Sequence, residues 1–245
     1  KWLQSSTKPQ IDPNKKPSNP FSAFTTHAKM MIKRNNEFYN KLSKDKFLNT
    51  ECEIRLEDAR ETSMRANSVS AIITSPPYVT SYEYADIHQL TAYWFEYITD
   101  ITGFRKKFIG TFYSMNQNIT SNSLIAQKII NSLLKKDKRT AKEVANYFND
   151  MQAVGKEMHR VLKKDGHVCL VIGNTTFKNI KVKSAEAFAQ ILTSLGFELV
   201  EVIKRSIPHK LIPTIRDKKS GRFSKLKNKD SKLVYPEEYI LIAKK

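Results

Sequence analysis

Apolar residues recur along the chain with two spacings, one typical of helices and the other of strands. Helical spacing covers residues 22–42, 85–97, 140–162 and 184–195, where apolar side chains return every three or four positions. Compact or alternating apolar runs predict strands at 51–56, 71–74, 167–173, 197–203 and 238–243. Because the two kinds of element are interleaved, the pattern predicts an α/β fold.

The residues before the first predicted helix have no such period. Residues 1–21 are polar and contain four prolines. Proline fixes its own backbone angle and lacks an amide donor, so such a stretch does not continue a helix or a sheet. We therefore expect an arm or linker at 1–21 and the folded part of the chain at 22–245.

The predicted strand at 71–74 ends on a rigid segment. Thr74 and Ser75 are followed by Pro76, Pro77 and Tyr78. Proline cannot donate to a sheet ladder, so the strand stops there and the chain leaves in a fixed geometry. A hydroxyl and an aromatic ring are then presented at the carboxyl edge of a strand, where open α/β sheets bind ligands. The alternative is an ordinary Pro-Pro turn with a tyrosine packed nearby.

A second candidate residue is acidic. The alternating run at 51–56 leads into Glu57, Asp58 and Ala59. If that run is a strand, it delivers Asp58 to the same edge of the sheet. The alternative is an aspartate that caps a helix or closes a turn, which is a common role for this residue type.

The charge of the chain favours a polyanionic partner. The sequence has 42 Lys and Arg against 24 Asp and Glu, a net charge of +18. The excess is clustered, because residues 204–232 contain eleven Lys or Arg and two Asp, a net charge of +9. Basic clusters bind nucleic acid through counterion release. The basic stretch at 204–232 lies in a long loop between two predicted strands. Long loops are either functional or disordered, and we interpret this one as a phosphate-contacting arm.

Other features limit the class of protein. The apolar runs are far shorter than the roughly 20 residues that span a membrane, and the polar start contains no signal peptide. The two cysteines, Cys52 and Cys169, lie in predicted strands and are expected to be buried thiols in a reducing compartment. The five histidines have no metal-ligand spacing, so no metal site is expected. These features predict a cytoplasmic protein.

With the motif at 74–78 in this context, the chain resembles the S-adenosylmethionine-dependent amino-methyltransferases that modify exocyclic nitrogens of DNA bases. Their catalytic motif is (Asp/Asn/Ser)-Pro-Pro-(Tyr/Phe/Trp), and the Thr-Ser-Pro-Pro-Tyr form is most similar to the N4-cytosine branch. The helix, glycine and buried strand at 140–173 are also similar to the fifth strand unit of these enzymes. The resemblance covers roughly residues 51–245 and implies a Rossmann-like class I methyltransferase sheet, with its third to seventh strands in this chain.

The resemblance also implies roles for individual residues. Ser75, Pro76, Pro77 and Tyr78 are expected to be catalytic, and S-adenosylmethionine is the expected cofactor. Asp58, Ala59, Thr74 and Ser75 are expected to contact that cofactor, with Asp58 at its adenine. Double-stranded DNA is the expected partner in a prokaryotic, nucleoid-associated setting. The expected nucleic-acid contacts are Tyr82, Tyr84, Lys204, Arg205, His209, Lys210, Arg216, Lys218, Lys219 and Arg222.

One part of the family's cofactor site is missing from the sequence. The family holds the methionine moiety with a Phe-x-Gly-x-Gly loop, where the absent side chains let the backbone approach the ligand. This chain has seven glycines, and no two are close enough to build that loop. The third and fourth strands are not neighbours in the family's sheet, so a gap is expected between them. We expect a second polypeptide or an N-terminal segment to supply the first two strands and the loop.

Three alternative functions remain open at this point. The same chemistry could methylate N6 of adenine, and a basic chain with this motif could act on RNA. A protein of another class, a non-catalytic DNA-binding subunit, would use the motif only as a turn. A role in a restriction-modification system is what the resemblance implies.

Overall fold

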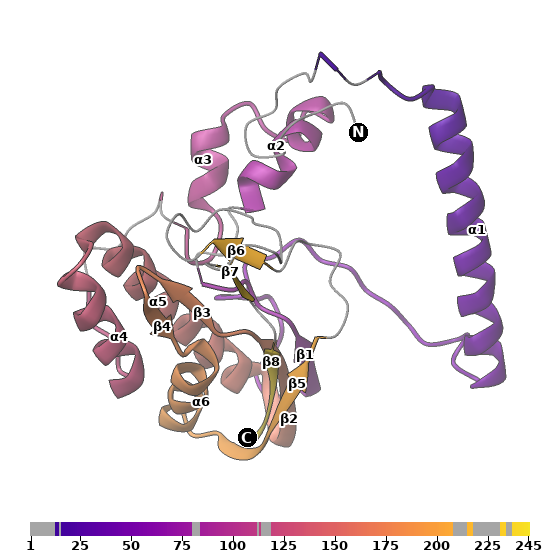
Figure 1. Cartoon of the computed structure of the whole chain (residues 1–245). Coiled ribbons are helices and arrows are strands. Elements are labelled where there is room, and N and C mark those ends of the chain that lie inside the picture. Colours follow the sequence, from indigo (N-terminus) through magenta and orange to yellow (C-terminus); the bar gives the residue numbers. More distant parts are fainter. Residues whose placement is uncertain are drawn as a thin grey trace. The chain divides into compact units, whose positions relative to one another are not determined.

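The computed structural model describes residues 13–14, 16–79, 84–111, 113, 119–207, 215–217, 231–233 and 237–245. The chain divides into two compact units. One comprises residues 1–56 and 86–95, and the other comprises residues 57–85 and 96–245. The second unit contains the main sheet (Figure 1), and residues 74–78 belong to it.

The main sheet has four strands in the order β1-β2-β8-β5. β1 (Val69–Thr74) pairs in parallel with β2 (Leu162–Ile172), and β8 (Glu237–Lys244) pairs antiparallel with β2. β5 (Glu198–Ser206) pairs antiparallel with β8. The α/β fold and the antiparallel pairing of the last two long strands are thereby confirmed. These directions bring four strand ends to one edge of the sheet. They are the carboxyl ends of β1, β2 and β5 and the amino end of β8.

Three helices form the core with the sheet: α4 (Leu124–Leu134), α5 (Lys138–Val161) and α6 (Ser184–Ser194). Figure 1 shows them together beside the strands. Alternation along β2 buries Val168, Leu170 and Ile172 completely, while Cys169 and Val171 between them are half-buried. Ile73, which is paired with Cys169, is 80% exposed, so the sheet is packed on one face and more open on the other.

Short elements connect this framework. α3 (Ile101–Lys106) begins at Asp100, whose carboxylate accepts from the amides of Thr102 and Gly103. β3 (Thr175–Phe177) and β4 (Ile180–Val182) form a hairpin after β2. Inside the basic segment, β6 (Ile215–Asp217) and β7 (Ser231–Leu233) pair antiparallel, so this segment contains a small hairpin of its own.

The first unit contains a long helix with no buried residue. α1 (Pro20–Lys44) begins after Asn19, whose side chain accepts from the amide of Ser22, and this confirms the predicted helix. Its apolar residues stay exposed, with Phe24 at 74% and Met31 at 68%. α2 (Tyr84–Trp94) belongs largely to the same unit and confirms the predicted helix there, although Trp94 is 84% exposed.

The prediction of a strand at 51–56 is wrong. These residues have no strand or helix, and Ile54 and Leu56 are almost fully exposed. An alternating pattern is not sufficient for a strand, because its backbone donors and acceptors also need a neighbouring strand. The described part of the chain offers none at this position. The main sheet therefore ends at β1, and Cys52 is exposed, not buried as expected.

Candidate active site

The motif lies where the pairing of β1 with β2 places it. Thr74 is opposite Leu170, so the next residue, Ser75, leaves the sheet beside Val171. The Ser75 Oγ donates to the carbonyl oxygen of Val171 at 3.2 Å, and the serine is otherwise exposed. Pro76 is buried and Pro77 is half-buried, so the two rigid residues anchor the turn. The predicted position at the carboxyl edge of a strand is confirmed.

Tyr78 is held at both its ring and its hydroxyl. The hydroxyl donates to Oε2 of Glu238 at 3.4 Å. The ring lies against Gly173, because a Cβ added there would be 2.7 Å from Cε2 of Tyr78. Burial raises the pKa of the Tyr78 phenol, and the negative charge of Glu238 raises it further. The ring is therefore half-buried, protonated at neutral pH and restricted in its orientation.

Glu238 is a buried carboxylate that sequence reasoning did not single out. It is 8% exposed and lies on β8, opposite Arg205 of β5. The Arg205 Nε donates to its Oε1 at 2.6 Å, and a guanidinium Nη donates to the same oxygen. Its position directly before the apolar run at 239–243 could have identified it, because a charged residue on a core strand requires a partner.

A second tyrosine lies behind the motif on α5. The hydroxyl of Tyr147 is completely buried and has no hydrogen-bond partner among the described residues. Burial raises the pKa of Tyr147, and Tyr78 and Tyr84 raise it further. Gly110 approaches the ring so closely that a Cβ there would be 2.7 Å from its Cδ2. Tyr147 is therefore a buried phenol of the core that is close enough to Tyr78 to interact with it electrostatically.

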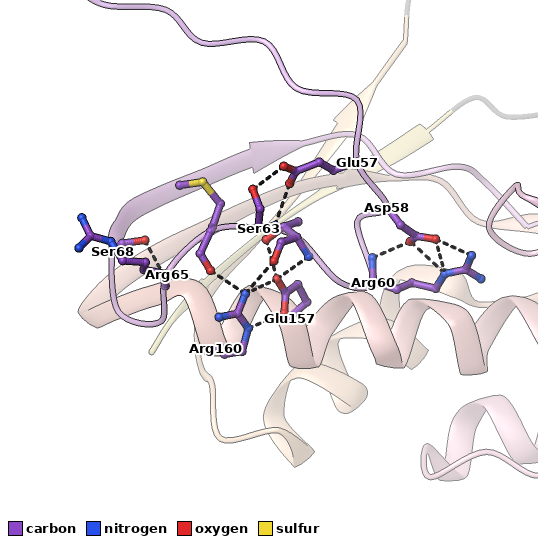
Figure 2. A network of polar contacts seen from close by, with 10 residues as sticks. Glu57, Asp58, Arg60, Ser63, Arg65, Ser68, Glu157 and Arg160 are labelled. Atoms are coloured by element: carbon purple, nitrogen blue, oxygen red, sulfur yellow. Dashed lines mark hydrogen bonds and ion pairs between the residues drawn. The ribbon is translucent and has the colours of Figure 1, made fainter. Parts of the chain in front are cut away.

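Asp58 is placed in a loop instead of at a strand end. Its Oδ1 accepts from the backbone amide of Arg60 at 2.8 Å, and the Arg60 guanidinium contacts both carboxylate oxygens (Figure 2). The hydrogen bond from Arg60 lowers the pKa of Asp58. Arg60 also reaches Asp150 of α5 at 3.0 Å, and Asp150 accepts from the amide of Gly110 at 2.7 Å. Asp58 and its neighbour Ala59 remain exposed.

The same loop is clamped to α5 by Glu157, which sequence reasoning also missed. Glu157 accepts from the amide and the hydroxyl of Thr62 at 2.8 and 2.5 Å, and from two guanidinium nitrogens of Arg160 at 2.6 and 2.7 Å. Arg160 in turn donates to the carbonyl of Met64 at 2.8 Å. These bonds, that from Arg160 foremost, lower the pKa of Glu157 to about 2. We name Thr62, Glu157 and Arg160 the loop clamp (Figure 2).

The predicted nucleic-acid contacts fall into two groups. Lys204 and Arg205 lie at the end of β5, where their charges meet Glu237 at 2.7 Å and Glu238. Tyr84 begins α2 and is half-buried. For Arg216, the structure describes only the backbone in β6. The other expected contacts, Tyr82, His209, Lys210, Lys218, Lys219 and Arg222, lie outside the described residues.

Neither a metal centre nor a membrane span is found among the described residues. They contain no group of three or more His, Cys, Asp or Glu side chains that could hold a metal ion. None of their helices is long and apolar enough to cross a lipid bilayer.

Comparison with known families identifies the class of protein. Residues 69–245 match the family model of the N6/N4 DNA methylases, and the chain belongs to this DNA methylase family. Among individual proteins, the chain is 24% identical over 200 residues to the type II methyltransferase M.MvaI of Kocuria varians. That match covers 74% of this chain and 43% of the relative, so the chain spans less than half of the relative's length.

Solved structures with a partial likeness carry related names. A putative DNA modification methylase of Thermus thermophilus, TTHA0409, matches with a TM-score of 0.37 and 17% identity over 78% of this chain and 52% of that chain. The same protein complexed with S-adenosyl-L-methionine matches with a TM-score of 0.38 and 16% identity, over 78% of this chain and 54% of that one.

Proposed function

We propose that this chain is the catalytic portion of a site-specific DNA methyltransferase that methylates the exocyclic N4 of a flipped cytosine. The observation that carries the proposal is the Ser75–Tyr78 segment at the carboxyl end of β1, with Tyr78 packed on Gly173. Membership of the DNA methylase family supports it. A role in restriction-modification follows the name of the M.MvaI relative and is part of the proposal.

The motif suits an amine that is a poor nucleophile. The lone pair of the cytosine amine is delocalised into the ring, so transfer requires the nitrogen to become tetrahedral. Two rigid acceptors, the Ser75 hydroxyl and the Pro76 carbonyl, would take hydrogen bonds from its two hydrogens. Acceptors that are fixed beforehand stabilise a transition state without reorganising during the reaction. Ser75 fits this role because its hydroxyl is exposed and makes a long bond to Val171.

Tyr78 would stack on the base. The target amine is paired inside a duplex, so the base must leave the stack to reach the motif. Base–aromatic stacking contributes about 1–3 kcal/mol per base. Gly173 lies against the Cε2 and Cδ2 side of the half-buried ring, and the base would stack on the part of the ring that is exposed.

The cofactor of this proposal is S-adenosylmethionine, which supplies the methyl group as an electrophile at its sulfonium. The chain provides part of a site for it. Asp58 and Ala59 are exposed at the loop before β1, and Thr74 and Ser75 lie at the strand end. The Asp58 carboxylate is bound by Arg60, so an adenine amine would share or replace that contact. The methionine moiety needs a glycine loop that the seven glycines of this chain do not form.

A second polypeptide or a further segment would complete the site. β1 pairs only with β2 among the described strands, which leaves its other edge open. Ile73 of β1 is 80% exposed, as expected of a side chain that a missing element covers. Unpaired strand edges are unstable and prone to association. The proposed partner adds strands beside β1 and brings the glycine loop to its carboxyl end.

Double-stranded DNA is the proposed substrate, and the segment at 204–232 is the proposed phosphate-binding arm. β5 ends and β8 begins at the same edge as the motif, so both stems of this segment emerge beside Tyr78. A net charge of +9 in the segment favours the sugar-phosphate backbone over any particular base sequence. Lys210, Arg216, Lys218, Lys219 and Arg222 are its proposed contacts.

The test is mass spectrometry of nucleosides from a methylation-free host. The host expresses this chain together with the coding sequence immediately upstream. N4-methylcytosine is the expected product, and a Tyr78→Ala variant is expected to form much less of it. N6-methyladenine would keep the mechanism and change the base. DNA without a modified base would contradict the proposal and favour a non-catalytic DNA-binding subunit.

A further inference from the structure

We infer that Glu238 and Arg205 form a positioning pair for Tyr78, and that Arg205 serves this pair instead of contacting DNA. The inference rests on the proposed function in one respect, namely that the Tyr78 ring is the surface on which the base stacks. It replaces the earlier expectation that Arg205 binds nucleic acid. It also assigns a role to a buried carboxylate that the methyl-transfer chemistry does not use.

The burial of Glu238 is the first observation. A carboxylate that is 8% exposed is costly unless charged or polar groups pair with it. Arg205 meets it across the β5–β8 pairing, with Nε at 2.6 Å from Oε1. The other oxygen, Oε2, faces the Tyr78 hydroxyl at 3.4 Å. Each oxygen of Glu238 is thus directed to a different partner, one in the sheet and one in the motif.

The neighbouring pair provides a comparison within the same two strands. Lys204 and Glu237 are one position away from Arg205 and Glu238, and their charges meet at 2.7 Å. The two cations are equally exposed, Lys204 at 57% and Arg205 at 58%, and the pairs differ in their carboxylates, because the Glu237 side chain is 38% exposed and that of Glu238 is 10% exposed. Adjacent residues of a strand point to opposite faces. Only the Arg205–Glu238 pair is therefore directed toward the motif.

Gly173 is the second constraint on the ring. A Cβ at this position would be 2.7 Å from Cε2 and 3.1 Å from Cδ2 of Tyr78, so any side chain would displace the ring. The Gly173 backbone restricts one side of the ring, and Glu238 restricts its hydroxyl. A stacking residue held this way has lost its rotational freedom before the base arrives, which favours a productive complex.

Two donors of Arg205 are directed to one buried oxygen of Glu238, so the two charges neutralise each other. Although the Arg205 side chain is 58% exposed, an arginine neutralised in this way attracts a phosphate less than an unpaired one does. Removing a phosphate contact lowers the salt dependence of DNA binding by about one unit of slope. Arg205→Gln should leave that slope unchanged, and it should instead disturb Tyr78.

The experiment follows Tyr78 directly, by NMR of this chain with ¹³C-labelled tyrosine rings. The Tyr78 resonance is assigned by its loss in Tyr78→Phe and titrated with pH. Glu238→Gln is expected to shift this resonance and to lower the phenol pKa, because a nearby negative charge is removed. Arg205→Gln and Gly173→Ala should also shift the resonance. Glu237→Gln and Lys204→Gln are the matched controls and should leave it unchanged.

Several outcomes decide the inference. A Tyr78 titration that is the same in Glu238→Gln as in the wild type would overturn it, as would a loss of salt slope in Arg205→Gln. If Glu238→Gln does not fold, Arg205→Gln and Gly173→Ala give the same test. In the enzyme completed by its partner, Glu238→Gln should lower kcat about tenfold with KM for DNA unchanged, and Glu238→Asp should restore part of it. If the Tyr78 resonance shifts in Glu238→Gln but the completed enzyme methylates no DNA, the proposed function is rejected and the positioning of Tyr78 by Glu238 and Arg205 is retained.

Discussion

Two polar sites on the same core use their groups in different ways. In the loop clamp, Glu157 accepts four hydrogen bonds of 2.5–2.8 Å from Thr62 and Arg160. At the motif, Ser75 and Tyr78 make bonds of 3.2 and 3.4 Å, which lie at or beyond the ordinary range. The clamp is satisfied by the chain itself. The motif holds Tyr78 in place and leaves the Ser75 hydroxyl and the Tyr78 ring for another molecule.

The difference in hydrogen bonding distinguishes the structural loop clamp from the proposed catalytic site, although both contain the same types of residue. Glu157 and Glu238 are both buried glutamates that pair with an arginine. Glu157 uses its second partner, Thr62, to fasten the loop at 57–64 to α5, whereas Glu238 uses its second partner to orient Tyr78. Substitution in the clamp should therefore cost stability, and substitution at the motif should cost activity.

The largest effect is expected from Tyr78→Ala in the complete enzyme. Loss of stacking worth about 1–3 kcal/mol lowers the rate of methyl transfer by a factor of about 5 to 160. Tyr78→Phe keeps the stacking surface but loses the contact with Glu238, so it should lose less than Tyr78→Ala and about as much as Glu238→Gln. The measurement is transfer of labelled methyl groups to DNA, with circular dichroism as the control for folding. A wild-type rate in Tyr78→Ala would remove the motif from the mechanism.

A smaller loss is expected at the clamp, and it concerns stability. Glu157→Gln replaces charge-assisted hydrogen bonds with neutral ones and should lower the free energy of unfolding by about 1.5–3 kcal/mol. Urea unfolding followed by circular dichroism measures this loss. Glu143→Gln, on the same helix, affects a more exposed pair with Arg139 at 3.5 Å and should change stability by less than about 0.5 kcal/mol. Equal losses of unfolding free energy in the two variants would show that the loop clamp stabilises the fold no more than an exposed ion pair does.

The clamp also predicts a dependence on pH. The pKa of Glu157 is lowered from 4.5 to about 2 in the folded chain, so the unfolded chain binds the proton more tightly. The stability that Glu157 contributes is therefore complete above its unfolded pKa and is lost as the pH falls toward about 2. Unfolding midpoints in urea should decline more steeply between about pH 5 and pH 2 in the wild type than in Glu157→Gln. Parallel declines would contradict this.

The smallest structural effect is expected at Asp58, which lies in the same loop. The Asp58–Arg60 pair is partly exposed, so Asp58→Asn should cost less than about 1 kcal/mol of stability. If Asp58 anchors the adenine, the same change should weaken S-adenosylmethionine binding about tenfold in the complete enzyme. Calorimetric titration measures this affinity. An unchanged affinity for S-adenosylmethionine would show that Asp58 binds Arg60 and does not contact the cofactor.

The sequence was sufficient for features that depend on local pattern. Two prolines after a β-branched run locate the end of β1 and the motif, and the apolar runs at 167–173 and 238–243 locate β2 and β8. It failed where the outcome depends on a distant neighbour. The run at 51–56 alternates as a strand does, but it has no partner strand among the described residues.

The supporting residues were hidden for the same reason. Glu157 and Thr62 are 95 positions apart, and Tyr78 and Glu238 are 160 positions apart. Thr62, Glu157 and Glu238 belong to no motif, and only the packing of α5 and the pairing of β2 with both β1 and β8 bring them to their partners. The motif of a site can therefore be read locally, while the residues that hold it in place become visible only in the fold.

One measurement tests the central claim, that the Ser75–Tyr78 segment is a methyl-transfer site and the clamp is its scaffold. Wild type, Tyr78→Ala and Glu157→Gln are expressed with the upstream coding sequence in a methylation-free host, and DNA nucleosides are quantified per folded enzyme. The account predicts N4-methylcytosine from the wild type and from Glu157→Gln below its unfolding temperature, and much less from Tyr78→Ala. Equal methylation by Tyr78→Ala and the wild type would contradict it.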